Sequence, residues 1–439
     1  MPKRRYLYAL SAGLVATLGL TACSGGSSQG ADSPQSVPSA SNAAGKKITV
    51  WVMQDDYTDK TLNAINAQFT KQTGAKVDVQ VQQWDGITTK ITTALSTSTP
   101  PDVLDIGNTQ VASFAATGGL ADLTSYKKDL QQGQTWLGGL VEPATVDGKL
   151  YAVPGFAGAR AVIYNKTMWK KAGVTSAPTT MSELESDLAK VKAAQSGSDF
   201  SPFYLPGQDW YVGMQFVWSA GGDLATKSGD TWTAGLSTPQ AQKGLTAFKK
   251  FQNAYSSTAS QTLFTDTPDQ NQVFADGKTS AIVATNGAIA NIQKANPALK
   301  DSDLGTFAMP AADGTQPVML GGSDWGIAAK SKNQQLALQW TKIAASPQMQ
   351  QKWVFGNDGW IPNSTQATKA ATADVPAITK GFFTAALISK ATPASPQWAT
   401  IEGTKDVNNL FSSIASGKQS VANAAKSFDG KLNKTLNAG

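Results

Sequence analysis

The sequence predicts an α/β protein built from two units with open, mostly parallel sheets, and three observations predict it. Strand-like and helix-like segments alternate with short links between residues 48 and 108. The chain that follows Lys46 is too long for one core, since single cores stop growing at about 250–300 residues. Pro154-Gly155 then interrupts a strand-like run where a second unit begins, as a crossing between two units requires.

The first elements follow the two regular periodicities. Residues 48–53 (ITVWVM) form an apolar run typical of a buried strand, and residues 76–81 (KVDVQV) alternate cleanly. Apolar residues at helical spacing fill 62–69, and Gly74 supplies a helix stop. A second helix is predicted over 87–95, and residues 101–108 (PDVLDIGN) form a third strand.

Polar and aromatic residues follow each of these strands. In open α/β sheets, ligands bind outside the carboxyl ends of the strands. The loops at these ends carry six candidate ligand contacts, which are Asp55, Asp56, Trp84, Asp85, Asn108 and Thr109.

The later elements continue the α/β pattern. Residues 274–292 are expected to form a turn, a strand and the start of a helix, and residues 318–343 a strand and then a helix. The last sixty residues look helical. The stretch 208–211 (QDWY) interleaves polar and aromatic groups, and on a strand Asp209 and Tyr211 would share one face, opposite Trp210.

The N-terminus predicts export and lipid anchoring. Lys3, Arg4 and Arg5 precede an uncharged apolar stretch, so residues 1–22 read as a signal peptide. Residues 20–23 (LTAC) resemble a bacterial lipobox, and Cys23 is the only cysteine, so we expect its acylation. Residues 23–45 are rich in Ser, Gly, Ala and Pro and are expected to form a disordered tether on the outer face of the cytoplasmic membrane.

Composition excludes several kinds of chemistry. The chain has no histidine, which excludes Ser-His-Asp and Cys-His catalysis and His-ligated zinc. Its formal charge of +6 includes the three cations of the signal peptide, and the remaining charges are scattered, so no nucleic-acid partner is expected. No cofactor and no metal are expected. The 12 tryptophans and the low charged fraction of 15% suit sugar recognition.

Four stretches together resemble the extracellular solute-binding lipoproteins of sugar ABC importers, the family that includes maltose-binding protein. They are 148–166 (GKLYAVP…IYNK), 274–278 (FADGK), 318–343 (VMLGGS…TKI) and the lipobox. The resemblance spans roughly residues 46–439. It implies a periplasmic-binding-protein-like fold of two α/β lobes, 46–155 with 310–355 and 156–309 with 356–439, joined by a hinge of several crossings. It also implies a saccharide held in the cleft between the lobes and a transmembrane permease as partner; we expect a monomer.

The resemblance carries over to the sugar contacts only in part. Asp55 and Asp56 stand where relatives place a polar pair, and Asp209 with Tyr211 matches a Glu-x-Tyr contact. Ile106, Thr109 and Gln110 replace the Trp, Asp and Arg of the maltose binder, Gly158 replaces a glutamate near Arg160, and Asn286-Gly287-Ala288 lacks a following tryptophan. An oligosaccharide other than maltose is therefore expected.

Each candidate has a structural alternative. Asp55 or Asp56 could cap the following helix, Trp84 could lie beneath its strand, Trp360 could be core, and Arg160 could pair with an acid instead of a hydroxyl. The remaining candidates are the residues of 208–211, Asn286, and three residues within 322–325. In full, the candidates beyond the first three loops are Arg160, Gln208, Asp209, Trp210, Tyr211, Asn286, Gly322, Asp324, Trp325 and Trp360.

Two other functions compete with sugar capture. A secreted glycoside hydrolase would also be exported and rich in tryptophan, but no pair of carboxylates stands in a recognisable acid–nucleophile arrangement. A binding protein for another polar or cationic solute would use the acids of the proposed loops. The sequence therefore predicts a binding protein rather than an enzyme, and a di- or oligosaccharide as its ligand.

Overall fold

The structure is a computed structural model, which describes residues 34–195, 197 and 199–438. The predicted signal peptide and the lipidation site Cys23 lie outside the described residues. The described chain has two main sheets. The first has the order β14-β6-β13-β3-β1-β2, with the bounds β1 (Lys47–Met53), β2 (Lys76–Gln82), β3 (Val103–Gly107), β6 (Ala152–Gly158), β13 (Gly321–Ile327) and β14 (Ile361–Pro362).

The second sheet is smaller and has the order β10-β7-β11. Its strands are β7 (Arg160–Asn165), β10 (Ala281–Thr285) and β11 (Leu304–Phe307). Three two-stranded ribbons complete the strands, namely β4 (Thr145–Val146) with β5 (Lys149–Leu150), β8 (Ala225–Ser228) with β9 (Thr231–Ala234), and β12 (Val318–Met319) with β15 (Ser389–Lys390).

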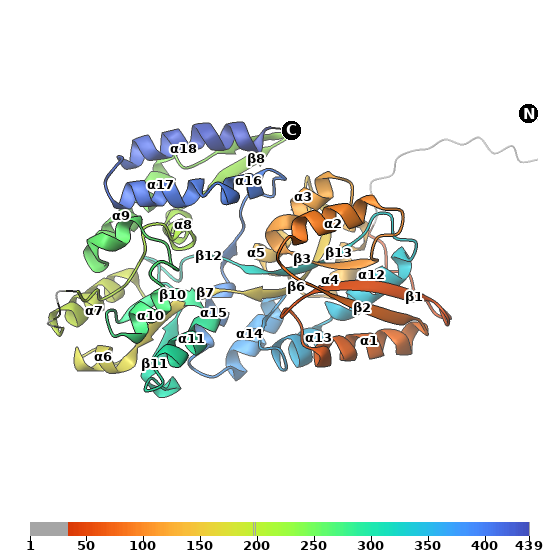
Figure 1. Cartoon of the computed structure of the whole chain (residues 1–439), viewed down its shortest axis with the longest axis horizontal. Helices are drawn as coiled ribbons and strands as arrows, with labels where there is room; N and C mark the ends of the chain where they lie inside the picture. Colours follow the sequence, from red (N-terminus) through yellow and green to blue (C-terminus); the bar gives the residue numbers. More distant parts are fainter. Residues whose placement is uncertain (1–33, 196, 198, 439) are drawn as a thin grey trace, which may run out of the picture. The chain divides into compact units, whose positions relative to one another are not determined.

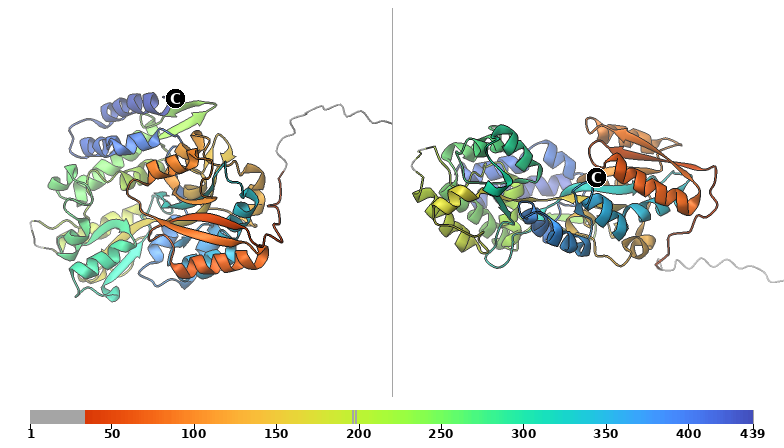
Figure 2. Two further views of the ribbon diagram at one scale, coloured as in Figure 1. Left: turned by 45° about the vertical axis from the view of Figure 1, so that its right-hand side comes forward. Right: turned by 90° about the horizontal axis from the view of Figure 1, so that it is seen from below.

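The helices divide between the two sheets (Figure 1, Figure 2). Those gathered at the first sheet are α1 (Asp59–Thr73), α2 (Ile87–Ser96), α3 (Val111–Ala116), α4 (Lys127–Gln131), α5 (Gly138–Val141), α12 (Gln334–Ala344) and α13 (Pro347–Met349). Those on the side of the second sheet are α6 (Lys166–Lys171), α7 (Met181–Ala193), α8 (Trp210–Ser219), α9 (Pro239–Tyr255), α10 (Gln270–Ala275), α11 (Gly287–Ala295) and α15 (Lys380–Ala386). Helices α16 (Trp398–Gly403), α17 (Asp406–Ala415) and α18 (Val421–Leu436) form a further layer, in which α17 packs on α8 and α9 and α18 packs on α9 and β9. Helix α14 (Thr365–Asp374) follows β14 and packs on both β14 and α15.

The first elements confirm the sequence predictions. β1 and β2 cover the predicted strands, and Leu62, Ile65 and Phe69 are the buried face of α1. Gly74 ends α1 with φ +77°, a conformation that costs glycine little. The N-cap of α1 is Thr58, whose hydroxyl accepts a hydrogen bond from the Thr61 amide. The alternative that Asp55 or Asp56 caps this helix is therefore wrong.

The second sheet is buried on both faces. Along β7, Val162 joins one apolar core, whereas Ala161 and Ile163 face another. Alternation along a strand explains this division, since successive side chains point to opposite faces. The strand predicted for 208–211 is wrong, because Asp209 is the N-cap of helix α8 and accepts a hydrogen bond from the Val212 amide.

Residues 34–45 correct the prediction of a disordered tether over 23–45. The Val37 amide donates to Asp129 Oδ2 at 2.7 Å, and the Ala40 amide donates to Gln339 Oε1 at 3.0 Å. Ala43 is buried in the core of the first sheet. The described part of the predicted tether is thus attached to the folded chain by specific contacts.

The α/β fold class is confirmed, and its open sheets have mixed strand directions. β1 is parallel to β2 and β3, whereas β13, β6 and β14 pair antiparallel, as do all strands of the second sheet. β6 of the first sheet ends at Gly158 and β7 of the second begins at Arg160, so the chain crosses between the sheets at Ala159. This crossing falls a few residues after the predicted boundary at 155.

Candidate functional site

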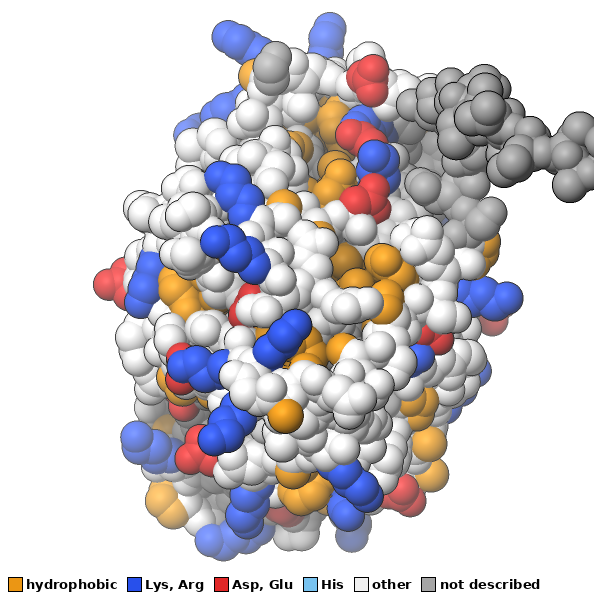
Figure 3. Space-filling view, turned by 90° about the vertical axis from the view of Figure 1, so that its right-hand side faces the viewer, with side chains coloured by type: hydrophobic (Ala, Val, Ile, Leu, Met, Phe, Trp, Pro, Cys, Tyr) orange, Lys and Arg blue, Asp and Glu red, His pale blue; other side chains and the backbone are white. Residues whose placement is uncertain are grey.

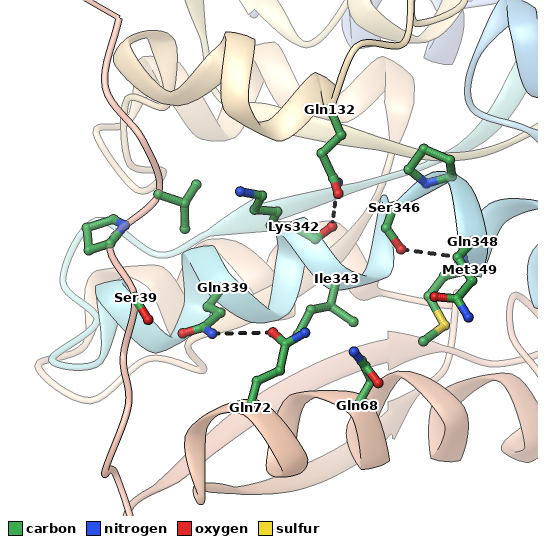
Figure 4. A pocket seen from close by; sticks show the side chains of 13 residues that line it. Ser39, Gln68, Gln72, Gln132, Gln339, Lys342, Ile343, Ser346, Gln348 and Met349 are labelled. Carbon is green, nitrogen blue, oxygen red and sulfur yellow. Dashed lines mark hydrogen bonds between the residues drawn. The ribbon is translucent and has the colours of Figure 1, made fainter.

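A cavity of about 570 Å³ has a lining whose chemistry makes it a poor ligand site (Figure 4). It lies between the N-terminal segment and helices α1 and α12. Its polar groups largely bind one another: Gln339 Nε2 donates to Gln72 Oε1 at 3.4 Å, and Gln132 Nε2 donates to the Lys342 carbonyl at 2.8 Å. No aromatic side chain lines it. Gln339 also accepts a hydrogen bond from the Ala40 amide, which holds the N-terminal segment against α12.

A second cavity, of about 460 Å³, has the composition expected of a ligand site. Six of the predicted contacts line it, namely Asn108, Thr109, Arg160, Gln208, Trp210 and Tyr211. Seven further residues line it that the sequence analysis did not single out, namely Phe264, Asp266, Met319, Gly321, Glu402, Lys405 and Asn408. The cavity therefore combines the end of β3, the start of β7 and the start of α8 with three later parts of the chain, which are the loop before α10, the junction of β12 and β13, and the region of α16 and α17.

Three stacked side chains form one wall of this cavity. The Trp210 and Tyr211 rings stack at 4.2 Å between centroids, with 29° between their planes. The Arg160 guanidinium carbon lies 3.7 Å from the Tyr211 ring centroid, a cation–π contact. Two groups this close to one ring must lie on opposite faces, so Trp210 and Arg160 cover both faces of Tyr211. The stack therefore holds the guanidinium in a fixed position, and its N–H donors suit the hydroxyl oxygens of a sugar. Arg160 has a role that the sequence analysis did not consider, because its guanidinium is stacked on Tyr211.

The amides in the cavity are held in fixed orientations. Asn108 is buried, and its Nδ2 donates to the Leu320 carbonyl at 3.0 Å and the Gly139 carbonyl at 3.3 Å. Gln208 Nε2 donates to the Thr262 carbonyl at 2.7 Å, and Asn408 Nδ2 donates to the Gln208 carbonyl at 3.0 Å. Each amide nitrogen is thus occupied by the protein, which fixes the side chain without using its oxygen. Oriented acceptors of this kind recognise the hydroxyl hydrogens of an uncharged ligand.

Charges in the cavity balance. Arg160 and Lys405 are opposed by Asp266 and Glu402. Burial raises the pKa of the Glu402 carboxyl above its ordinary value. A lining with equal numbers of cations and anions gives no net attraction to an anionic or a cationic solute. It does offer charge-assisted hydrogen bonds, which are the stronger kind, to a neutral ligand.

A further sequence signal supports Arg160, which the sequence analysis already names as a candidate. It is the only arginine of the chain after Arg5, whereas lysines are plentiful. Arginine presents a rigid planar fork and stacks on aromatic rings, as lysine does not. By contrast, no local pattern marks Asp266, Glu402 or Lys405, which come together only through the fold.

Asp55 and Asp56 lie outside the cavity lining. Asp55 is exposed in a turn, with φ +68°. Asp56 is buried and accepts a hydrogen bond from Ser323 Oγ at 2.7 Å, which ties the loop after β1 to β13. Burial raises the pKa of Asp56 to about 6, although the bond from Ser323 lowers it. Asp105 lies beside it, and burial and the Asp56 charge raise its pKa well above the ordinary value.

Four further candidates belong to the protein core or to its hydrogen-bond framework. Asp209 is 1% exposed and caps α8. Asp324 is fully buried, and Trp325 stacks on Tyr57 at 4.9 Å. Trp360 stacks on Phe156, and its Nε1 donates to the Asp56 carbonyl at 2.7 Å. Asp324, Trp325 and Trp360 support the first sheet and its crossings, and Asp209 supports the start of α8. The structure places none of these four in the cavity lining.

The remaining candidates differ in their exposure. Asp85 and Asn286 are exposed, and Gly322 adopts φ +138° with its backbone against that of Phe156. Trp84 is 43% exposed, so the alternative that it lies buried beneath its strand is wrong. A methyl group on Gly107 would lie 3.5 Å from the Trp84 ring. Trp84 therefore flanks the end of β3, one residue before Asn108.

Other kinds of site find no support in the described residues. Within these ranges, no group of three or more His, Cys, Asp or Glu side chains could hold a metal ion. On the face shown in Figure 3, Lys and Arg side chains are spread among uncharged groups and do not gather into a patch. None of the helices in the described part of the chain is long and apolar enough to span a bilayer.

The fold and the cavity define a solute-binding protein with two α/β lobes. A sequence profile described as "Bacterial extracellular solute-binding protein" matches residues 55–351. The chain belongs to this family. Its members bind solutes, so the prediction of a binding protein rather than an enzyme is confirmed. Membership also confirms the predicted periplasmic-binding-protein-like fold class.

Individual relatives bind carbohydrates, as their names state. The chain is 37% identical over 444 aligned positions to the diacetylchitobiose binding protein DasA of Streptomyces coelicolor, with 99% of each chain covered. It is 24% identical to the maltodextrin-binding protein MdxE of Bacillus subtilis, with 95% of this chain and 94% of that one covered. The solved structure of the sugar-binding protein MalE from Xanthomonas citri superposes with a TM-score of 0.76 at 21% identity, covering 89% of this chain and 97% of that one.

Proposed function

We propose that this protein captures a di- or oligosaccharide in the 460 Å³ cavity and delivers it to the permease of an ABC importer. The observation that carries the proposal is the wall formed by Trp210, Tyr211 and Arg160, beside oriented amides and balanced charges. The names of the relatives DasA and MdxE support a carbohydrate. The alternative of a cationic solute is not favoured, because Arg160 and Lys405 offset the acids of the lining.

Capture is proposed to proceed by closure of the two lobes about the crossings. The cavity is lined from both sides of the Ala159 crossing, so a ligand that touches both sides binds the closed state better and shifts the population toward it. One ion pair already links the two groups of elements, since Lys227 of β8 contacts Asp147 in the turn between β4 and β5. Such an exposed pair contributes at most about 1 kcal/mol, so most of the free energy that favours the closed state must come from ligand contacts.

Anchoring remains part of the proposal. Acylation of Cys23 would hold the protein at the outer face of the cytoplasmic membrane. Cys23→Ala is expected to release the protein into the medium without changing its affinity for ligand. Retention of a processed Cys23→Ala protein on the membrane would contradict the anchor.

Calorimetry tests the ligand class. The purified full-length protein is titrated with diacetylchitobiose, cellobiose, maltose, trehalose and xylobiose, and with a polyamine as the cationic comparison. We expect at least one saccharide to bind with a micromolar or lower dissociation constant, about −8 kcal/mol or better. Binding of the polyamine alone would overturn the carbohydrate assignment. Small-angle scattering with the saccharide that binds tests closure, because the radius of gyration should fall.

A further inference from the structure

The junction between α16 and α17 has a backbone conformation that its residue does not favour. Lys405, which directly precedes α17, has φ +56° and ψ 27°, in the left-handed region. In this region the Cβ atom crowds the following carbonyl oxygen, so residues other than Gly, Asn and Asp seldom adopt it. Lysine is also not among the residues preferred at the N-cap of a helix, which is the position of Lys405 in α17.

The other non-glycine residues with positive φ have local explanations. Within the part of the chain that the structure describes, they are Asn42, Asp55, Gln132 and Asp147. Three of the four are Asn or Asp, which tolerate the left-handed region. The fourth, Gln132, is held by its side chain, whose Nε2 donates to the Lys342 carbonyl at 2.8 Å. Lys405 differs, because its side chain forms no hydrogen bond or ion pair with any described residue.

The acids near Lys405 do not neutralise it. Asp406 pairs with Lys431 at 2.6 Å and accepts a hydrogen bond from the Thr404 hydroxyl. Glu402, three positions before Lys405, forms no ion pair with any residue of the described ranges. Instead, Glu402, Lys405 and Asn408 all line the 460 Å³ cavity, at intervals of three residues. Lys405 therefore brings an exposed and unpaired charge to the wall of the ligand site.

The turn between the helices explains the backbone conformation of Lys405 but not the choice of lysine. Only Thr404 and Lys405 join the two helices, and the residue that follows the C-cap of a helix is often left-handed. Glycine is the usual residue there, because it adopts this conformation without strain. Strained positions of this kind persist where function requires the residue. What lysine adds to this place is an ammonium group with three N–H donors.

We propose that Lys405 is a specificity-determining residue of the saccharide site, and that its ammonium donates a hydrogen bond to an acceptor oxygen of the bound sugar. The inference rests on the proposed capture of a saccharide and adds the residue with which α16 and α17 select the ligand. Hydroxyl and ring oxygens of a sugar accept such charge-assisted bonds. A site built to bond a ligand oxygen rejects analogues that lack it, because its own polar group is then left unpaired.

Two substitutions at Lys405 separate the effect of its backbone from that of its side chain. Lys405→Gly removes the strain and the ammonium together, so the full-length protein should unfold at a higher urea concentration than wild type yet bind saccharide at least tenfold more weakly. Lys405→Met removes the ammonium and keeps the strain, so it should lose the same affinity and unfold like wild type. Affinity is measured by calorimetry with diacetylchitobiose, cellobiose, maltose, trehalose and xylobiose.

Lys418→Met is the control for these variants. Lys418 is also exposed and lies between α17 and α18, but it does not line the 460 Å³ cavity, so its substitution should change neither affinity nor stability. Binding of a saccharide by Lys405→Met within threefold of wild type would overturn the inference and leave saccharide capture intact. A Lys405→Gly protein no more stable than wild type would overturn it too, because no strain would then need a functional reason. If none of the five saccharides binds the wild type, the proposed function itself fails, and the role of Lys405 with it.

Discussion

Replacing Arg160 tests the central wall of the site. Arg160→Met keeps the length and apolar stem of the side chain and removes the guanidinium. The contact of that group with Tyr211 at 3.7 Å contributes about 0.5–2 kcal/mol to the rigidity of the wall. A charge-assisted hydrogen bond to the ligand contributes about 1.5–3 kcal/mol. Because the two effects overlap in one side chain, we expect a loss of about 2–4 kcal/mol, or roughly 30-fold to 1,000-fold in affinity.

The assay is calorimetric titration with the saccharide that binds most tightly, at pH 7.5. Lys352→Met is the control, because Lys352 also lies over an aromatic ring, with its Nζ 5.4 Å from the Trp353 ring, but does not line the 460 Å³ cavity. Thermal melts of both variants separate a loss of binding from a loss of folding. An Arg160→Met protein that melts like the wild type and binds within threefold of it would refute the assignment of this wall to the ligand.

Three further predictions concern other parts of the structure. Burial raises the pKa of Asp209 to about 6, so between about pH 4 and pH 6 the native state keeps a proton that the unfolded chain has lost, and the free energy of unfolding falls as the pH rises through this range. Asp209→Asn keeps the helix cap but carries no charge. Urea unfolding should therefore show it about 1–3 kcal/mol more stable than wild type at pH 7.5 and equal to wild type at pH 4. Gly155→Ala should lower the melting temperature by several degrees, because its methyl group would lie 2.6 Å from the Ser323 carbonyl and Tyr57 Oη, whereas Gly158→Ala, with open space around it, should not. Trp84→Ala should weaken saccharide binding without lowering stability, since its exposed ring becomes a ligand contact only on closure; unchanged affinity would remove Trp84 from the site.

Local patterns predicted the elements of the first sheet well. The helical spacing of Leu62, Ile65 and Phe69 and the stop at Gly74 depend only on neighbouring residues, and α1 ends as expected. The strand interpretation of residues 208–211 was wrong because the local sequence gives no helical pattern there. Helix α8 is apolar on nearly every side because it is buried on nearly every side, so it shows no helical period.

The sequence predicted only part of the candidate site. Strand ends and loops can be recognised from local sequence, whereas the distant residues that contact them cannot. Asn108 and Thr109 follow a recognisable strand and do line the cavity. Asp56 has the same sequence context, yet its carboxylate is bound by Ser323, 267 positions along the chain. Only the pairing of β13 with its neighbours decides that Asp56 supports the sheet rather than a ligand.

The place of Arg160 in the topology separates its part in recognition from the contacts that drive closure. β6 ends at Gly158 in the first sheet and β7 begins at Arg160 in the second, so any side chain at this point lies where the two sheets meet. Pairing with Thr285 fixes its backbone to β10, while Tyr211 fixes its guanidinium. A ligand can shift the equilibrium between open and closed lobes only through its difference in affinity for the two states, and a shift from 1:99 to 99:1 requires about 5.5 kcal/mol. In a rotation about the crossings, displacement grows with distance from the hinge, so ligand contacts at Arg160 change little between the two states and hold the ligand in both. The free energy of closure must therefore come from ligand contacts farther from the crossing, which form only when the lobes approach.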